Sequence, residues 1–384
     1  MSFEFATAGR IVFGWGAFDQ VPTLAKELGK TALLVLGREG RHGEALGGKL
    51  AEQGIDSVAF RVDGEPTVRT VEVAVGLARA EGCDLVIAVG GGSVIDAGKA
   101  AAAMATQPGG LLDHLEVVGA GRQLTAPGLP FVAVPTTAGT GSEVTRNAVL
   151  DVPEHRVKVS LRSPALLARV AVVDPSLTLS LPPEITATTG MDALTQLIEP
   201  FVGVGANPLT DGFCREGIAR AARSLAAACR DGSDREARED MATASLLGGL
   251  ALANAKLGAV HGLAGVLGGT FGVPHGAICA RLLPFVMDAN IQALEKQSAD
   301  HPALKRYAEV ARMLTGVSDA EPRDGVYYVR NLCDTLNIRP LPIADATSDE
   351  LDAVIVASRN ASSMKGNPVV LADAHLREIL LAAG

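Results

Sequence analysis

The chain has 384 residues, of which 48% are hydrophobic and 20% are charged. That length is too great for one ordinary hydrophobic core, so we expect a soluble globular protein of two domains. The formal net charge is −9, and no Lys- and Arg-rich run carries interleaved aromatic side chains. These features argue against nucleic acid as a partner.

The N-terminal segment lacks a basic region followed by an apolar core, and nowhere do about eighteen apolar residues run without a charge or a turn. We therefore expect a cytoplasmic protein with no membrane partner. The cysteines are odd in number, widely scattered and without CxxC spacing, which suggests neither a disulfide framework nor a thiolate metal site. We interpret them all as reduced core residues: Cys83, Cys214, Cys229, Cys279 and Cys333.

The first half of the chain alternates short apolar runs with Ala-rich helical stretches. Short apolar runs between helices are typical of buried parallel strands joined by helical crossovers. The pattern predicts an α/β domain with a parallel sheet. Its expected strands are residues 31–36, 85–89, 131–134 and 170–173.

After Leu181-Pro182-Pro183 the pattern becomes long, Ala- and Leu-rich and helical in period, as in residues 216–229 and 238–252. Almost no strand-like run remains, so we expect an all-α domain. The two prolines make a suitable border because the residue before a proline is pushed out of the helical region. We predict an α/β domain over residues 1–181 and a helical domain over residues 182–384.

Two glycine-rich segments follow predicted strands. Residues 90–99 read Gly-Gly-Gly-Ser-Val-Ile-Asp-Ala-Gly-Lys, and residues 135–145 hold five hydroxyl side chains and two glycines. Either segment can be a structural turn or a helix cap. Both can also bring main-chain N–H groups to a phosphate at a helix N-terminus. Because open α/β sheets bind ligands at the carboxyl ends of their strands, we favour a shared dinucleotide site.

Asp192 and Gln196 lie four residues apart on a predicted helix, so their side chains share one face. With His261 and His275 they form an oxygen and nitrogen donor set suited to a divalent metal. On one continuous helix the two histidines would be about 21 Å apart at roughly 1.5 Å per residue. The site therefore requires a break in the helix between the two histidines. Gly268-Gly269, Gly272 and Pro274 predict such a break.

Each histidine alone could be a buried side chain satisfied by backbone. Asp192, between Met191 and Ala193, is harder to explain without a partner charge or a metal, because a buried carboxylate needs one.

These motifs, in order along the chain, resemble the iron-containing (group III) alcohol dehydrogenase family. The resemblance runs from Val12-Phe13-Gly14-Trp15-Gly16 to Asn367-Pro368. It implies a Rossmann-like α/β domain, a helical domain (the dehydroquinate synthase-like two-domain plan), a nicotinamide cofactor between them, iron or zinc beside the nicotinamide ring, and a homodimer. The motifs that carry it are Gly90-Gly91-Gly92-Ser93 with Asp96, residues 135–145, residues 190–194, residues 260–264 and Pro274-His275-Gly276.

Carried over to this chain, the resemblance assigns the cofactor pyrophosphate to Gly91, Gly92 and Ser93, with Asp96 in the same motif. The remaining expected cofactor contacts lie elsewhere in the α/β domain: Thr136, Thr137 and Thr140 around the phosphates and adenosine, and Lys158 near the nicotinamide ribose.

Cofactor choice depends on the end of the first predicted strand. Many NAD-using members have an aspartate there, whereas this chain has Gly37 followed by Arg38. Loss of a carboxylate and gain of a guanidinium would tolerate or favour the 2′-phosphate of NADP. Arg38 and Lys158 could equally be solvated surface charges, so NAD, NADP or both stay open.

The metal site departs from the family pattern. Asp192, His261 and His275 match, but Gln196 stands where the family has its first ligand histidine, and a glutamine carbonyl is a weaker ligand for Fe²⁺ or Zn²⁺. Another frequent family histidine, a presumed proton relay, is Gly265 here.

We therefore expect an NAD(P)-dependent alcohol dehydrogenase that moves hydride between the nicotinamide and a small alcohol, aldehyde or ketone. Asp192, His261, His275 and Gln196 would hold a metal that polarises the substrate oxygen. One alternative is a metal-independent reductase of the maleylacetate reductase type, with His261 or His275 as proton donor. The others are a dehydroquinate synthase-like lyase and a nucleotide-binding protein without catalysis.

Overall fold

The computed structural model describes residues 2–40, 42–155 and 157–384, and the chain divides into two compact units. One unit contains Ala6–Thr137 and Gly141–Leu179. The other contains Ser180–Gly384 together with the N-terminal residues up to Phe5 and the short segment Ala138–Thr140. The change at residue 180 lies next to the border expected from the paired prolines.

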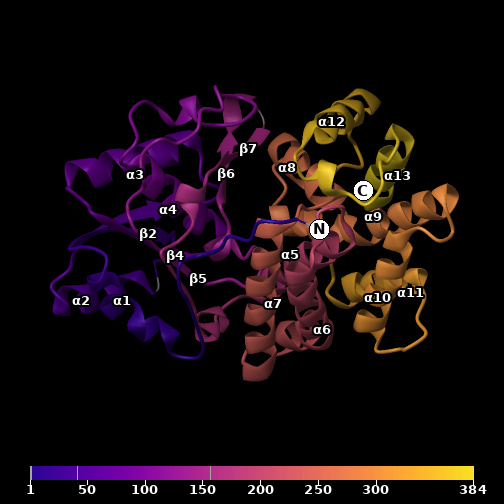
Figure 1. Ribbon diagram of the computed structural model, residues 1–384, viewed down its shortest axis with the longest axis horizontal. Helices are drawn as coiled ribbons and strands as arrows, with labels where there is room; N and C mark the ends of the chain where they lie inside the picture. Colours follow the sequence, from indigo (N-terminus) through magenta and orange to yellow (C-terminus); the bar gives the residue numbers. More distant parts are fainter. Residues whose placement is uncertain (1, 41, 156) are drawn as a thin grey trace. The chain divides into compact units, whose positions relative to one another are not determined.

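The first unit is built on a six-stranded parallel sheet in the order β1-β8-β5-β4-β2-β3 (Figure 1). The α/β prediction is confirmed, and all four expected strands are present. The strands are β1 (Ile11–Phe13), β2 (Thr31–Gly37), β3 (Asp56–Val62), β4 (Leu85–Gly90), β5 (Phe131–Pro135) and β8 (Val170–Val173).

The sequence pattern missed four strands. β1 has only three residues, and β3 is an edge strand whose exposed polar side chains interrupt any apolar run. The other two, β6 (Asn147–Val152) and β7 (Val157–Arg162), form a separate antiparallel hairpin.

Side chains of the sheet alternate between its two faces, as the period of a strand requires. Leu34, Ile87 and Val132 pack on the face covered by α1 (Val21–Lys26) and α2 (Gly43–Glu52). Helices α3 (Val68–Ala80) and α4 (Gly92–Met104) cover the other face (Figure 1).

Helix α4 lies very close to the sheet because of Gly98. A Cβ atom there would lie 2.7 Å from the Cβ of Ala88 and 2.9 Å from a ring carbon of Phe131. Glycine is therefore required at this crossing, and the N-terminus of α4 is held at the end of β4.

A buried lysine ties α4 to the segment after β5. Lys99 is fully buried, and its ammonium donates to Ser142 Oγ (3.1 Å), Thr145 Oγ1 (2.8 Å) and the carbonyl of Asn147 (2.8 Å). Its charge is balanced by Asp96, 3.5 Å away, which accepts hydrogen bonds from the Ser142 hydroxyl and from the amide of residue 149. These bonds fix the hydroxyl-rich segment relative to the glycine turn.

The Lys99→Met variant should be strongly destabilised. Removing the ammonium leaves the buried carboxylate of Asp96 without its countercharge and three acceptors without their shared donor, which costs about 3–5 kcal/mol. Urea unfolding followed by circular dichroism measures the change. The control is Lys49→Met, which breaks an exposed pair with Asp19 and should cost about 1 kcal/mol or less. Equal midpoints for the two variants would contradict the role given to Lys99.

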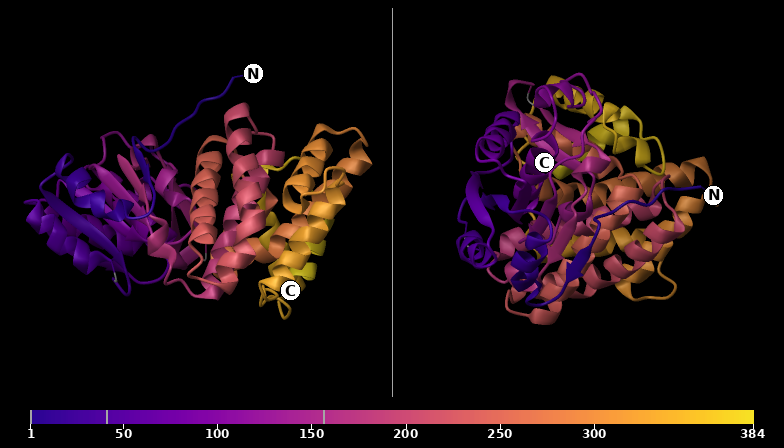
Figure 2. Two further views of the ribbon diagram at one scale, coloured as in Figure 1. Left: turned by 90° about the horizontal axis from the view of Figure 1, so that it is seen from below. Right: turned by 60° about the vertical axis from the view of Figure 1, so that its left-hand side comes forward.

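The second unit is helical in all its described residues with regular structure, as expected. Its long helices α5, α6 and α7 lie side by side (Figure 2). The helices are α5 (Pro183–Val202), α6 (Pro208–Arg230), α7 (Arg235–Asn254), α8 (Ala259–Phe271), α9 (His275–Gln297), α10 (Pro302–Thr315), α11 (Pro322–Thr335), α12 (Ser348–Asn360) and α13 (Asp373–Ala383).

Glycines set the spacing of these helices. A Cβ at Gly190 would lie 2.2 Å from Leu225 Cδ1, and one at Gly217 would lie 2.5 Å from Leu197 Cδ2. Among single helices of the described residues, only α9 is long and apolar enough to cross a membrane, and 61% of its apolar window is buried within the protein. Burial of this kind is typical of a core helix.

Candidate active site

Asp192 lies on α5 and is almost completely buried. One turn later, Gln196 donates from its amide nitrogen to Asp192 Oδ2 (3.0 Å) and to the carbonyl of Gly139 (3.4 Å). The shared helix face predicted from the four-residue spacing is therefore present. Gln196 holds one oxygen of the carboxylate, which leaves Oδ1 facing away from the glutamine amide.

His261 is oriented by a carboxylate on its far side. Its Nδ1 lies 2.6 Å from Glu199 Oε2, and Glu199 Oε1 accepts the amide of Val260 at 2.7 Å. Gly258 makes this approach possible, since a Cβ there would lie 2.8 Å from Glu199 Oε1. A carboxylate on Nδ1 fixes the proton on that nitrogen, so the lone pair of Nε2 faces Asp192 Oδ1 at 3.3 Å.

The helix break that the metal site requires is present. Helix α8 ends at Phe271, Gly272 takes a left-handed conformation with φ of 67°, and α9 begins directly after Pro274. Gly268 and Gly269 stay inside α8. The break brings the two imidazole rings to 5.3 Å between centroids.

Close packing of α9 on α5 completes the approach of His275. A Cβ at Gly276 would lie 2.8 Å from the carbonyl oxygen of Thr188, which explains the glycine after this histidine. The Nε2 atom of His275 then lies 3.7 Å from Asp192 Oδ1, and about a third of its side chain is exposed.

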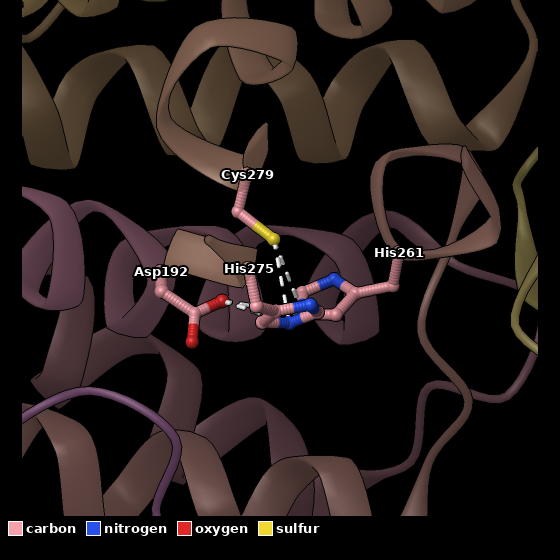
Figure 3. A group of neighbouring side chains, drawn as sticks. All are labelled: Asp192, His261, His275 and Cys279. Carbon is pink, nitrogen blue, oxygen red and sulfur yellow. Dashed lines mark hydrogen bonds and ion pairs between the residues drawn. The ribbon is translucent and has the colours of Figure 1, made fainter. Parts of the chain in front are cut away.

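A fourth residue, Cys279, joins this group. The side chains of Asp192, His261, His275 and Cys279 point toward one another, and one donor atom from each lies within 4.8 Å of the others (Figure 3). Cys279 is a free, buried core residue as expected, but the sequence interpretation did not foresee that it also belongs to this group. The missed signal was its position four residues after His275, which puts both on one face of α9.

The site has lone pairs facing one another without a donor between them. Among the described residues, Asp192 Oδ1 and Gln196 Oε1 are buried side-chain oxygens without a hydrogen-bond partner. Since His261 Nε2 presents a lone pair toward Asp192 Oδ1, the pair requires a positive charge between them, either a proton or a metal ion.

The electrostatics of the group point the same way. Burial alone would raise the pKa of Asp192, but the His275 and His261 rings outweigh it and lower this pKa to about 2. Burial opposes the charged forms of both histidines. The neighbouring sulfur and carboxylates outweigh that effect, so the pKa of His275 rises to about 9 and that of His261 lies well above its usual value. The site therefore attracts cations, and a metal must displace protons to bind.

The residues predicted to contact a cofactor pyrophosphate lie at one end of the parallel sheet. Gly91 is the N-cap of α4, and a Cβ there would lie 3.3 Å from Thr137 Cγ2. The amide of Thr136 donates to the carbonyl of Gly90 at 2.9 Å. Gly92 and Ser93 begin α4, where main-chain N–H groups lack helical acceptors.

The other predicted cofactor residues differ in their surroundings. Asp96 is engaged with the Lys99 group, and Thr140 belongs to the helical unit. Lys158 is not a solvated charge: its side chain is only 8% exposed and pairs with Glu65 at 3.3 Å. Arg38 is 81% exposed and lies 3.8 Å from the equally open carboxylate of Asp63.

Gly37 ends β2, and its only near neighbour for an added Cβ is Val94 Cγ2 at 3.6 Å. The backbone there would accept a side chain, so its absence opens the space beside Arg38.

Comparison with known proteins matches this architecture. Residues 8–175 match the model of the iron-containing alcohol dehydrogenases, and residues 186–384 match the C-terminal model of the same Fe-containing family. The chain belongs to the iron-containing alcohol dehydrogenase family. Membership makes it an alcohol oxidoreductase.

Individual members of the family resemble the chain over most of its length. Long-chain-alcohol dehydrogenase 1 of Geobacillus thermodenitrificans is 43% identical over 306 residues, which cover 77% of this chain and 76% of that protein. The crystal structure of a 1,3-propanediol oxidoreductase superposes with a TM-score of 0.90 at 33% identity, covering 100% of both chains. A sulfoacetaldehyde reductase from Bifidobacterium kashiwanohense, solved with NAD⁺, superposes at 0.87 with 29% identity, covering 100% of this chain and 99% of that one.

Glu199→Gln should weaken divalent metal binding by about 10–100-fold, because the carboxylate that orients His261 and raises its basicity is lost. Competition with a chromophoric chelator measures the affinity. Glu216→Gln, which alters an exposed pair with Arg220, is the matched control and should bind metal as the parent does. A Glu199→Gln protein with unchanged affinity would show that this carboxylate has no part in metal binding.

Proposed function

We propose that the protein is an NAD(P)-dependent, metal-assisted alcohol dehydrogenase that interconverts a small alcohol and its aldehyde or ketone. The observation that carries the proposal is the short distance from the buried Asp192 Oδ1 to the Nε2 atoms of His261 (3.3 Å) and His275 (3.7 Å). An unpartnered carboxylate oxygen and two imidazole nitrogens, from three different helices, lie close enough together to bind one cation. The 1,3-propanediol, long-chain-alcohol and sulfoacetaldehyde relatives support hydride transfer over the lyase and non-catalytic alternatives.

The residues fit a divalent metal, since a buried carboxylate oxygen without a hydrogen-bond partner meets two imidazole nitrogens. When bound, such an ion polarises the oxygen of the substrate as a Lewis acid. Asp192 and the two histidines would hold it. Glu199 keeps the proton of His261 on Nδ1, and Gln196 directs Asp192 by binding its other oxygen.

Proton movement in this chain differs from the family pattern at Gly265. An added Cβ there would meet nothing within 4 Å, so the face of α8 one turn after His261 is open. No side chain extends from that position to carry a proton. His275, whose side chain is about one third exposed, is the ligand with access to solvent.

The cofactor pyrophosphate would bind at the N-terminus of α4, where Gly91, Gly92 and Ser93 lie beside Thr137. Thr136 of the α/β unit and Thr140 of the helical unit remain proposed cofactor contacts. Asp96 acts as a positioning residue, because its carboxylate binds Ser142 and the amide of residue 149 and so holds the hydroxyl-rich segment. The NAD⁺ complex of the sulfoacetaldehyde reductase supports a nicotinamide cofactor. The homodimer and the cytoplasmic location stay predictions.

Removal of metal should abolish turnover and leave the fold intact. We expect protein dialysed against a chelator to lose dehydrogenase activity with primary alcohols and to regain it with Fe²⁺ or Zn²⁺, while nucleotide binding, followed by NADH fluorescence, persists. Undiminished turnover in the metal-free protein would instead favour the metal-independent reductase, with a histidine as proton donor.

Arg38 should control the use of NADP. Loss of a charge-assisted hydrogen bond of about 1.5–3 kcal/mol to the 2′-phosphate would lower kcat/KM for NADP by about 10–100-fold in Arg38→Ala, with little change for NAD. Gly37→Asp should shift preference toward NAD, because its carboxylate repels the phosphate. The ratio of kcat/KM for the two cofactors is the measurement. Equal ratios in the parent and both variants would exclude this role.

A further inference from the structure

The sulfur of Cys279 and the other three donor atoms lie within 4.8 Å of one another. The sulfur is 3.6 Å from His275 Nε2 and 3.8 Å from His261 Nε2. Donors bound tetrahedrally to one ion at about 2.0–2.1 Å for nitrogen and about 2.3 Å for sulfur are roughly 3.3–3.6 Å apart. The two sulfur–nitrogen distances are therefore at or slightly above those expected around one shared ion.

The placement of Cys279 differs from that of an inert core thiol. Cys333, for comparison, donates to the carbonyl of Ala280 at 3.4 Å, and burial raises its pKa to about 12. The Cys279 sulfur contacts an imidazole nitrogen of His261 and one of His275 (Figure 3), and it also interacts with the carboxylate of Asp192. A buried sulfur between two ring nitrogens and near a carboxylate is a donor arrangement, since soft sulfur and imidazole both suit Zn²⁺.

Gln196 has a different use. Its amide nitrogen donates to Asp192 Oδ2, so the glutamine stabilises the carboxylate that points Oδ1 at the cluster. A neutral amide also supplies less charge to a cation than a thiolate does. The ligand histidine that the family has at the position of Gln196 on α5 is missing here. Cys279 on α9, one turn after His275, takes its place as a donor.

We propose that Cys279, as a thiolate, is the fourth protein ligand of the metal, giving an Asp192-His261-His275-Cys279 site that selects Zn²⁺ over Fe²⁺. The inference rests on the proposed metal-assisted function. One thiolate and one carboxylate neutralise a divalent ion, whereas a carboxylate with neutral ligands leaves a net positive site. The softer, fully neutralised donor set favours zinc, for which thiolate is a preferred ligand.

Cobalt substitution tests this assignment with a readout other than activity. Metal-free protein loaded with Co²⁺ should show visible d–d bands of a tetrahedral site together with a near-ultraviolet thiolate-to-cobalt charge-transfer band. Cys279→Ser should keep d–d bands, which also shows that it folds and binds, and should lose the charge-transfer band. Cys229→Ser, on α6 and outside the group of four candidate ligands, is the matched control and should keep both.

Zinc selectivity gives a second measurement. After anaerobic equilibration with equal Zn²⁺ and Fe²⁺, the bound Zn:Fe ratio of Cys279→Ser should fall at least about tenfold below that of the parent, a change of roughly 1.4 kcal/mol. Gln196→Ala should keep the charge-transfer band.

The possible outcomes separate the two proposals. Cobalt d–d bands without charge transfer in the parent, or charge transfer that survives in Cys279→Ser, would overturn the thiolate ligand and leave the metal site in place. Parent protein without any d–d band would overturn the metal-assisted function and this inference together.

Discussion

The helical unit is organised around one polar cluster, in which the side chains of Asp192, His261 and His275 come together from α5, α8 and α9. Burying a carboxylate costs several kcal/mol unless a positive charge compensates it, so packing must hold the three helices in place around that charge. Glycines do this at the crossings. Gly276 lets α9 reach the backbone of α5, and Gly258 lets Glu199 approach the start of α8. The motif glycines are thus packing residues that bring the polar side chains together.

The α/β unit also buries a carboxylate, that of Asp96, and compensates it with the positive charge of Lys99. Lys99 supplies the cation to a buried carboxylate, two hydroxyls and a carbonyl, and in doing so joins α4 to the short 3-10 helix Ser142–Val144 and to the start of β6. The two clusters differ in that Lys99 supplies a permanent positive charge to the first, whereas the second, among the described residues, contains a carboxylate, two histidines and a cysteine but no lysine or arginine.

Much of this could be predicted from the sequence, for identifiable reasons. Central strands such as β4 and β5 are buried on both faces and give continuous apolar runs, whereas β3 is an exposed edge and β1 is too short to give a pattern. The break between His261 and His275 was readable because Gly272 and Pro274 have fixed conformational preferences. Cys279 was missed because CxxC spacing identifies metal sites built from two cysteines. A single cysteine four residues after a histidine does not show that spacing. The direction of the Gln196 amide and the association of Ala138–Thr140 with the helices depend on tertiary packing, which no spacing encodes.

The hydrogen bond from Gln196 to the carbonyl of Gly139 links a loop to the cluster. Gly139 lies in the short segment Ala138–Thr140, which follows Thr137 directly along the chain. The amide nitrogen of Gln196 donates both to the carbonyl of Gly139 and to the carboxylate of Asp192. One NH₂ group is thereby shared between a loop and a carboxylate. A histidine in place of Gln196 would present a single ring nitrogen on that side and could not hold both groups in this way.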